Sequence, residues 1–202
     1  MSALRRPAGL IGRALLLLAG FQVLLLGLAT LGSGLPPTTL RIHPWADNVR
    51  IVLTHTPRLG LAVPVALREP LLEIRHVPVD SPVPDWSLHL VPAHLAAEAA
   101  LALLAADAFR RRRAPLPAAL IGGGIAVAAL ASSTLAWTVC CASPNWAVAL
   151  ALAGLDPAIA LVLVPFGPVV AGAGLAAIAI GLGADAVARR QKHTKPPFLL
   201  TQ

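Results

Sequence analysis

The chain has 202 residues, of which 57% are hydrophobic and only 12% are charged, and its mean hydropathy is +0.77. A soluble domain is typically about one-quarter charged, so this composition excludes an ordinary water-soluble protein and predicts an integral membrane protein. The surplus positive charge lies in three clusters beside apolar runs: Arg5, Arg6 and Arg13; the four arginines at 110–113; and Arg189, Arg190, Lys192 and Lys195. Such clusters are a topology signal, and we expect no nucleic-acid partner.

Residues 1–32 are predicted to be an N-terminal transmembrane anchor, with the helix over 10–32. The apolar run from Ala14 to Gly32 is interrupted only by Gln22. The basic start and the "GSG" that follows are also compatible with a cleaved signal peptide. However, the run exceeds the roughly 7–15 apolar residues of a signal peptide and approaches the roughly 20 that a spanning helix needs. We therefore expect an uncleaved helix.

Residues 33–87 form the most polar part of the chain and are rich in proline. Four runs alternate apolar and polar residues with a period of two, which predicts short strands: "TLRIHP", "NVRIVLTH", "LLEIRHV" and "WSLHLV". Proline confines strands to sheet edges and to short lengths. We expect a small β-rich extracytoplasmic segment that lies on the membrane or on a partner, because so short a segment makes a marginal core alone.

A membrane helix bundle is predicted over residues 88–190, followed by a cytoplasmic tail over 191–202. One span covers about 88–109 and runs into the arginines at 110–113. Another begins near Pro117 and continues through "AALIGGGIAVAALASSTLAWTV", to residue 139. The glycines at 122–124 and the glycine-rich run over 172–183 predict close contact between helices.

Residues 145–187 are apolar almost throughout and allow two topologies. Two spanning helices there would give five crossings and would separate the last basic cluster from the other two. Alternatively, 143–165 divides at "GLDP" into two pieces of about ten residues, each too short to span. Gly154 and Pro157 break helices, and Asp156 can cap the second piece. The resulting re-entrant or interfacial hairpin leaves 168–188 as the fourth span.

We prefer the four-crossing topology because it places all three basic clusters in the cytoplasm. The predicted fold is therefore mainly α: a polytopic helix bundle with a small β-rich extracytoplasmic segment. It is expected in the cytoplasmic (inner) membrane, with both termini cytoplasmic.

The vicinal pair Cys140 and Cys141 contains the only cysteines of the chain and is expected at the outer end of the third span. The two residues fit small buried hydrophobes, a disulfide on the oxidising outer side, or a soft-metal site, since thiolates select Cu(I) and other soft cations. Pro144 would bend the chain beside the thiols and free backbone carbonyls, which would open such a site.

The features that follow this pair have a characteristic order. Pro144 comes within a few residues, an apolar run with Gly154 comes next, and the loop Pro165-Phe166-Gly167-Pro168 leads to a helix that ends at Arg189-Arg190. Over about residues 118–190 this order resembles the mercuric-ion transport proteins of bacterial mercury-resistance operons. The resemblance implies that Cys140 and Cys141 take a metal ion from the periplasmic side and pass it inward.

A second group of candidate residues is Asp85, His89, His94 and Glu98, in "DWSLHLVPAHLAAE". His94 and Glu98 are four residues apart and share a helix face. An acid near the middle of a span costs about 2.5–3.5 kcal/mol on insertion scales, and usually faces a bundle interior. Three interpretations stay open: a His94–Glu98 hydrogen bond, a protonated Glu98 packed on the third span, or an outer metal site or proton path in which His89 and His94 assist the thiols.

No dinucleotide fingerprint, phosphate-binding loop, hydrolase elbow or zinc-protease motif is present, so no catalytic residue is predicted. The expected function is capture or transport of a soft metal ion, Hg(II) or Cu(I). The alternative is a non-enzymatic accessory subunit of a larger membrane complex, such as a respiratory or copper oxygenase assembly. Expected partners are the lipid bilayer and either other membrane subunits or further copies of the chain.

Overall fold

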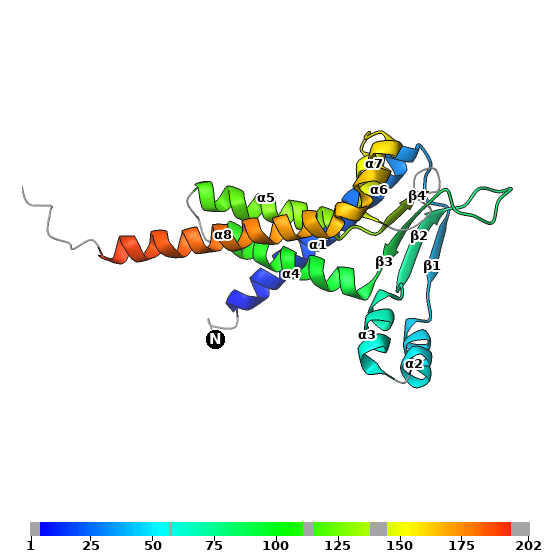
Figure 1. Cartoon of the computed structure of the whole chain (residues 1–202), viewed down its shortest axis with the longest axis horizontal. Helices are drawn as coiled ribbons and strands as arrows, with labels where there is room; N and C mark the ends of the chain where they lie inside the picture. The colour runs from blue at the N-terminus through cyan, green and yellow to red at the C-terminus, as the bar shows by residue number, and fades with distance from the viewer. Residues whose placement is uncertain (1–4, 57, 111–114, 138–144, 195–202) are drawn as a thin grey trace, which may run out of the picture.

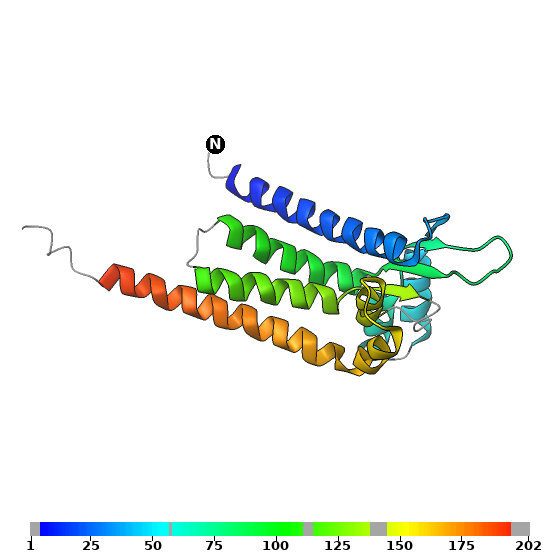
Figure 2. The ribbon, with the colours of Figure 1, turned by 90° about the horizontal axis from the view of Figure 1, so that it is seen from above.

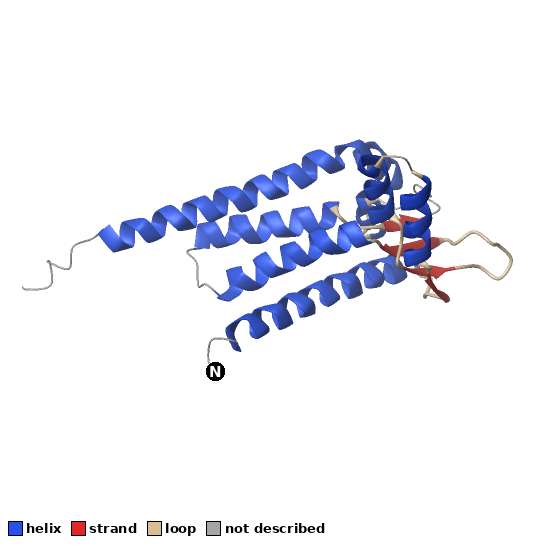
Figure 3. Cartoon of the chain, turned by 90° about the horizontal axis from the view of Figure 1, so that it is seen from below, coloured by secondary structure: helices blue, strands red, loops and turns tan. Residues whose placement is uncertain are grey.

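The computed structural model describes residues 5–56, 58–110, 115–137 and 145–194. The predicted site residues Cys140, Cys141 and Pro144 lie outside the described residues. Four long helices run alongside one another, and a small sheet with short helices closes one end of them (Figures 1 and 3).

The long helices are α1 (Arg5–Ser33), α4 (Pro92–Arg110), α5 (Pro115–Ala131) and α8 (Gly167–Thr194). They lie side by side in that order, each in contact with the next (Figure 2). Within the described residues, three stretches are long and apolar enough to cross a membrane, namely Gly9–Ser33, Pro92–Arg110 and Pro157–Arg190. The described part of α5 is a shorter apolar helix of 17 residues. The mainly helical fold and the membrane class agree with the prediction.

The predicted break at "GLDP" is confirmed. Two short helices, α6 (Trp146–Leu152) and α7 (Pro157–Leu163), precede the 3₁₀ turn η1 (Val164–Phe166). Gly154 has a φ of 105°, a conformation that side chains disfavour. Asp156 caps α7, as predicted, because its carboxylate accepts hydrogen bonds from the N–H groups of Ala158 and Ile159.

The sheet is antiparallel throughout and has the order β1 (Thr39–Ile42), β2 (Leu72–His76), β3 (Trp86–Leu90) and β4 (Leu135–Trp137). Three of the four predicted strands are present. The fourth prediction, over "NVRIVLTH", is wrong, because this run belongs to helix α2 (Trp45–His55), which pairs with α3 (Leu59–Arg68). Trp45, Val49 and Val52 recur at helical spacing and are the partly buried apolar residues of α2.

Two predicted helix boundaries also need correction. The second span was expected from residue 88, but helix α4 begins at Pro92 and 88–90 belongs to β3. The third was expected to reach residue 139, but α5 ends at Ala131 and 135–137 forms β4. The reason is pairing between distant segments: β3 and β4 hydrogen-bond to each other, and Pro92 suits the first turn of a helix, where no N–H is needed.

The main core lies where the sheet meets the helices. Trp86, Leu88 and Leu135 on one sheet face are buried against Leu25 of α1 and Trp146 of α6. The end of α1, the start of α4 and the end of α5 adjoin the sheet, and the start of α8 lies at the same end of the molecule, next to η1 (Figure 1). The opposite ends of α1, α4 and α8 carry the described basic residues Arg13, Arg110, Arg189 and Arg190.

Candidate functional site

Glu98 is the most buried charged residue among the described side chains of the long helices. It lies two turns into α4 and is 5% exposed. Gln22 of α1 donates a hydrogen bond from Nε2 to Glu98 Oε2 at 2.5 Å. Ser132, just beyond the end of α5, lies with Oγ 3.3 Å from Glu98 Oε1. One carboxyl group therefore links three neighbouring helices through hydrogen bonds, as a polar group in an apolar medium requires.

His94 joins the same network through Ser132. Its Nδ1 lies 2.7 Å from the Ser132 carbonyl oxygen, while the Ser132 hydroxyl points to Glu98 and to the Ala129 carbonyl oxygen. His94 and Glu98 share a helix face as predicted, and both contact the end of α5. The direct His94–Glu98 hydrogen bond, one of the open interpretations, is not present between these two described residues, which are linked through Ser132 instead.

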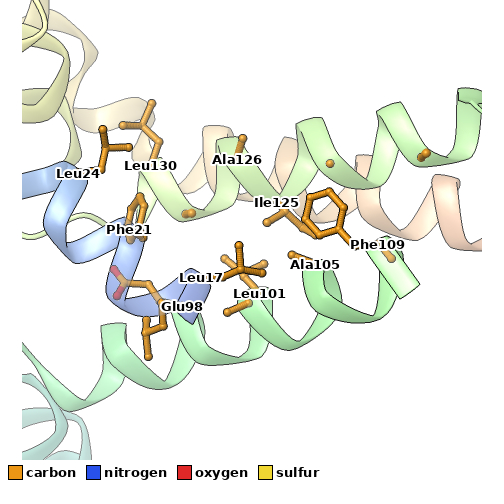
Figure 4. A pocket seen from close by; sticks show the side chains of 16 residues that line it. Leu17, Phe21, Leu24, Glu98, Leu101, Ala105, Phe109, Ile125, Ala126 and Leu130 are labelled. Carbon is orange, nitrogen blue, oxygen red and sulfur yellow. The ribbon is translucent and has the colours of Figure 1, made fainter. Parts of the chain in front are cut away.

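An apolar cavity of about 520 Å³ lies between α1, α4 and α5, and Glu98 is the one charged residue that lines it. Glu98 sits beside Phe21 towards one end, and Phe109 lies at the other (Figure 4). The remaining lining residues are Leu17, Leu18 and Leu24 of α1, Leu101, Ala102, Ala105 and Ala108 of α4, and Ala118, Gly122, Ile125, Ala126, Ala129 and Leu130 of α5. The cavity is suited to an apolar occupant with one polar group near Glu98.

A second polar cluster lies on the sheet face opposite the core. Glu73 is 6% exposed, and its carboxylate lies 3.3 Å from His43 Nε2 and 3.7 Å from Arg75 Nη1. The neighbouring His89 ring shares a 2.7 Å hydrogen bond with the Ser87 hydroxyl. Burial lowers the pKa of His89, Glu73 opposes this shift, and His43 and Arg75 add to it. His89 is therefore held as the neutral ring near pH 7.

The four predicted members of the Asp85, His89, His94 and Glu98 group lie in three different environments. Asp85 lies 3.7 Å from His76 on the neighbouring strand, His89 lies on the polar sheet face, and His94 and Glu98 lie between helices. Across the described ranges, no three His, Cys, Asp or Glu side chains gather closely enough to hold a metal ion. Residues 138–144, with the thiol pair, are not among those ranges.

The residues on either side of this segment, Trp137 and Asn145, both contact the sheet. Trp137 pairs with Trp86 at the end of β4, and the N–H of Asn145 donates to the Leu135 carbonyl oxygen at 2.8 Å. Asn145 then caps α6, accepting from the N–H groups of Ala147 and Val148. Both borders of the cysteine segment therefore belong to the sheet end of the molecule.

Sequence reasoning did not identify Gln22, Ser132 or Glu73 as members of polar networks. Gln22 had a visible signal, because it is the one residue with an amide side chain in the first apolar run. Ser132 and Glu73 had none, because the Ser132–Glu98 and Glu73–His43 contacts join residues 34 and 30 positions apart along the chain.

Comparison of the chain with protein-family models, with curated proteins and with solved structures gave no match. Three helices that are long and apolar enough to cross a membrane indicate a membrane protein. The sheet and the short helices α2, α3, α6 and α7 form a cap at one end of the long helices.

Proposed function

We propose that this protein captures a soft metal ion, Hg(II) or Cu(I), through Cys140 and Cys141 on the outer side of the cytoplasmic membrane. The observation that carries the proposal is the position of the two borders of the cysteine segment. Trp137 ends β4, and Asn145 hydrogen-bonds to Leu135 of the same strand, so both borders lie at the sheet end of the molecule, the end that this proposal places in water. Adjacent thiolates supply the soft ligands that such ions prefer.

The distribution of charge supports the orientation. Arg13, Arg110, Arg189 and Arg190 lie towards the ends of the helices that are remote from the sheet. Basic residues beside spans favour the cytoplasmic side, so the sheet would face outward. Four crossings, by α1, α4, α5 and α8, fit this arrangement. The short helices α6 and α7 then remain at the outer surface, since seven residues cannot span a bilayer.

Metal capture is tested on the purified full chain in lipid nanodiscs, reduced beforehand to open any disulfide. Hg(II) or Cu(I) is offered with glutathione as competitor, and bound metal is counted by mass spectrometry. We expect a single ion per wild-type chain and none on the Cys140→Ser, Cys141→Ser double variant.

The single variants Cys140→Ser and Cys141→Ser are the internal controls, because each keeps one thiol and should retain metal only at low competitor concentration. Exchange of the exposed His55 for Gln should leave binding unchanged. An unaltered metal count on the double variant would end the proposal.

A second candidate function, an accessory subunit, is supported by the cavity beside Glu98. A carboxyl group in a span usually faces a packed interior or marks a partner. Here the cavity it lines is formed by one side of α1, α4 and α5, and large apolar side chains such as Leu24 line its wall while remaining 58% exposed. A spanning helix of another subunit, with a polar residue near Glu98, would complete this site.

The accessory role is tested by filling the cavity. Ala105→Trp places a large ring among the lining residues, whereas Ile180→Trp places the same ring on α8, where Ile180 is 62% exposed and outside the cavity. We expect a subunit that co-purifies with the wild type and with Ile180→Trp to be lost from Ala105→Trp. Native mass spectrometry that finds only single chains or homo-oligomers of the wild type would count against this role.

A further inference from the structure

Helix α3 exposes an apolar surface that a water-soluble cap could not carry. Its ten residues include a single charged one, Arg68. Ala62 and Ala66 are buried, and five large aliphatic residues are exposed by 42% or more: Leu59, Leu61, Val63, Val65 and Leu67. Contiguous apolar surface of this kind marks contact with lipid or with another protein.

Helix α2 is more polar than α3, although Ile51 and Leu53 are exposed by 53% and 39%. It presents Asp47 and Arg50 as an exposed ion pair, followed by Thr54 and His55. The two helices are held together by a hydrogen bond from Trp45 Nε1 to the Ala66 carbonyl oxygen and by Asn48, whose amide reaches Glu69. The pair thus has one mixed layer, α2, which carries the exposed Asp47–Arg50 ion pair, and one apolar layer, α3.

Helix α3, the apolar layer, lies on the side of α2 that is nearer to the long helices, which lipid would surround. Helix α3 contacts α4 and lies nearer to the long helices than α2 does, and it runs across their direction (Figure 1). If α4 crosses the membrane, α3 therefore lies along its surface at the level where α4 begins. A helix of ten residues is about 15 Å long, which is too short to span but suits an in-plane position.

We propose that α3 is embedded in the headgroup region of the outer leaflet and that α2 covers it on the water side. The exposed basic residues Arg58 and Arg68 mark its two ends, where their side chains can reach lipid phosphates. A lipid surface is favoured over a protein partner because α3 contacts α4, a helix long and apolar enough to cross a membrane. The inference requires only that α4 crosses the membrane, and it is independent of metal capture.

The test measures depth with a nitroxide label in liposomes, in the full-length chain carrying Cys140→Ser and Cys141→Ser. Leu61→Cys places the label on α3, and Asp47→Cys, its matched control, places it on α2. We expect oxygen, which concentrates in lipid, to relax the label at 61 more than a water-soluble nickel chelate does. The order should be reversed at 47.

Either of two outcomes would overturn the proposal. A label at 61 that is relaxed mainly by the nickel chelate would place α3 in water. A label at 61 that is shielded from both reagents would mean that protein, not lipid, covers the helix. The wild-type chain provides a check without substitutions: a photoreactive phospholipid should cross-link to the peptide over 59–68 and not to the peptide over 45–55.

Discussion

At the residue scale, the hydrogen bonds of Glu98 explain how a carboxyl group is tolerated between apolar helices. An unpaired polar group there would cost several kcal/mol, and the network supplies a partner from α1 and one from the end of α5. Gln22 supplies a polar contact between α1 and α4. It adds to the alanine and leucine packing around Ala14, Ala102 and Ala106.

The Gln22–Glu98 hydrogen bond should be measurable in a double-mutant cycle. Gln22→Leu and Glu98→Leu each remove one partner, and we expect a coupling energy of about 0.6 kcal/mol, the average between membrane helices, and at most about 1.7 kcal/mol. Reversible unfolding in bicelles provides the measurement. Glu98→Gln is the conservative control, because an amide can still accept from Gln22 and donate to Ser132. A coupling energy of zero would show that the contact does not contribute to stability.

At the scale of elements, α5 and α8 form the closest helix pair, and two facing glycines make this approach possible. A Cβ atom on Gly174 would lie 2.8 Å from the Gly124 carbonyl oxygen, and one on Gly124 would lie 2.5 Å from the Gly174 carbonyl oxygen. Both distances are below van der Waals contact, so only glycine allows the backbones to meet. The predicted packing role of the two glycine runs is confirmed at these positions.

Adding one methyl group should therefore have opposite effects at two positions of α8. Gly174→Ala should lower the free energy of unfolding by about 1–3 kcal/mol, as overpacking does. Gly172→Ala should leave it unchanged or raise it by up to about 1 kcal/mol, because nothing lies within 4 Å and alanine favours the helix. Unfolding of the two variants in the same bicelles tests this. Equal losses at both positions would contradict the assigned contact.

At the scale of the whole molecule, the sheet restricts the topology. Strand β3 directly precedes α4, and β4 closely follows α5, and these two strands pair. Since β1 follows α1 and joins the same sheet, the adjoining ends of α1, α4 and α5 must lie on one side of the membrane. Because β3 and β4 pair, the chain between them must cross the membrane an even number of times.

The four-crossing topology predicts a labelling pattern in intact cells. In the chain with both native cysteines changed to Ser, Val79→Cys lies at the fully exposed hairpin between β2 and β3 and should react with a membrane-impermeant maleimide. Ala186→Cys, near the end of α8, should react only after permeabilisation. Labelling of residue 186 in intact cells would favour five crossings instead.

Segment length and hydropathy predicted the long helices, and helix-breaking residues predicted the separation of α6 from α7. The sequence could not decide between strand and helix over "NVRIVLTH", because Val49, Ile51 and Leu53 alternate while Trp45, Val49 and Val52 follow a helical period. Contact with α3 decided it. β4 was hidden inside an apolar run for a similar reason, since its partner lies some fifty positions earlier. The contact between Gln22 and Glu98, 76 positions apart, carries no local signal.

The late position of β4 in the chain also has a consequence for biosynthesis. The ribosome completes β1, β2 and β3 before α4, but β4 emerges only after α5 has been made. Until then β3 is an open edge, and Trp86 and Leu88 lack the cover that Leu135 and Trp146 later provide. The cap can therefore complete its fold only after α4 and α5 have been made. A chain stalled between these helices would expose the unpaired edge of β3 to chaperones and proteases.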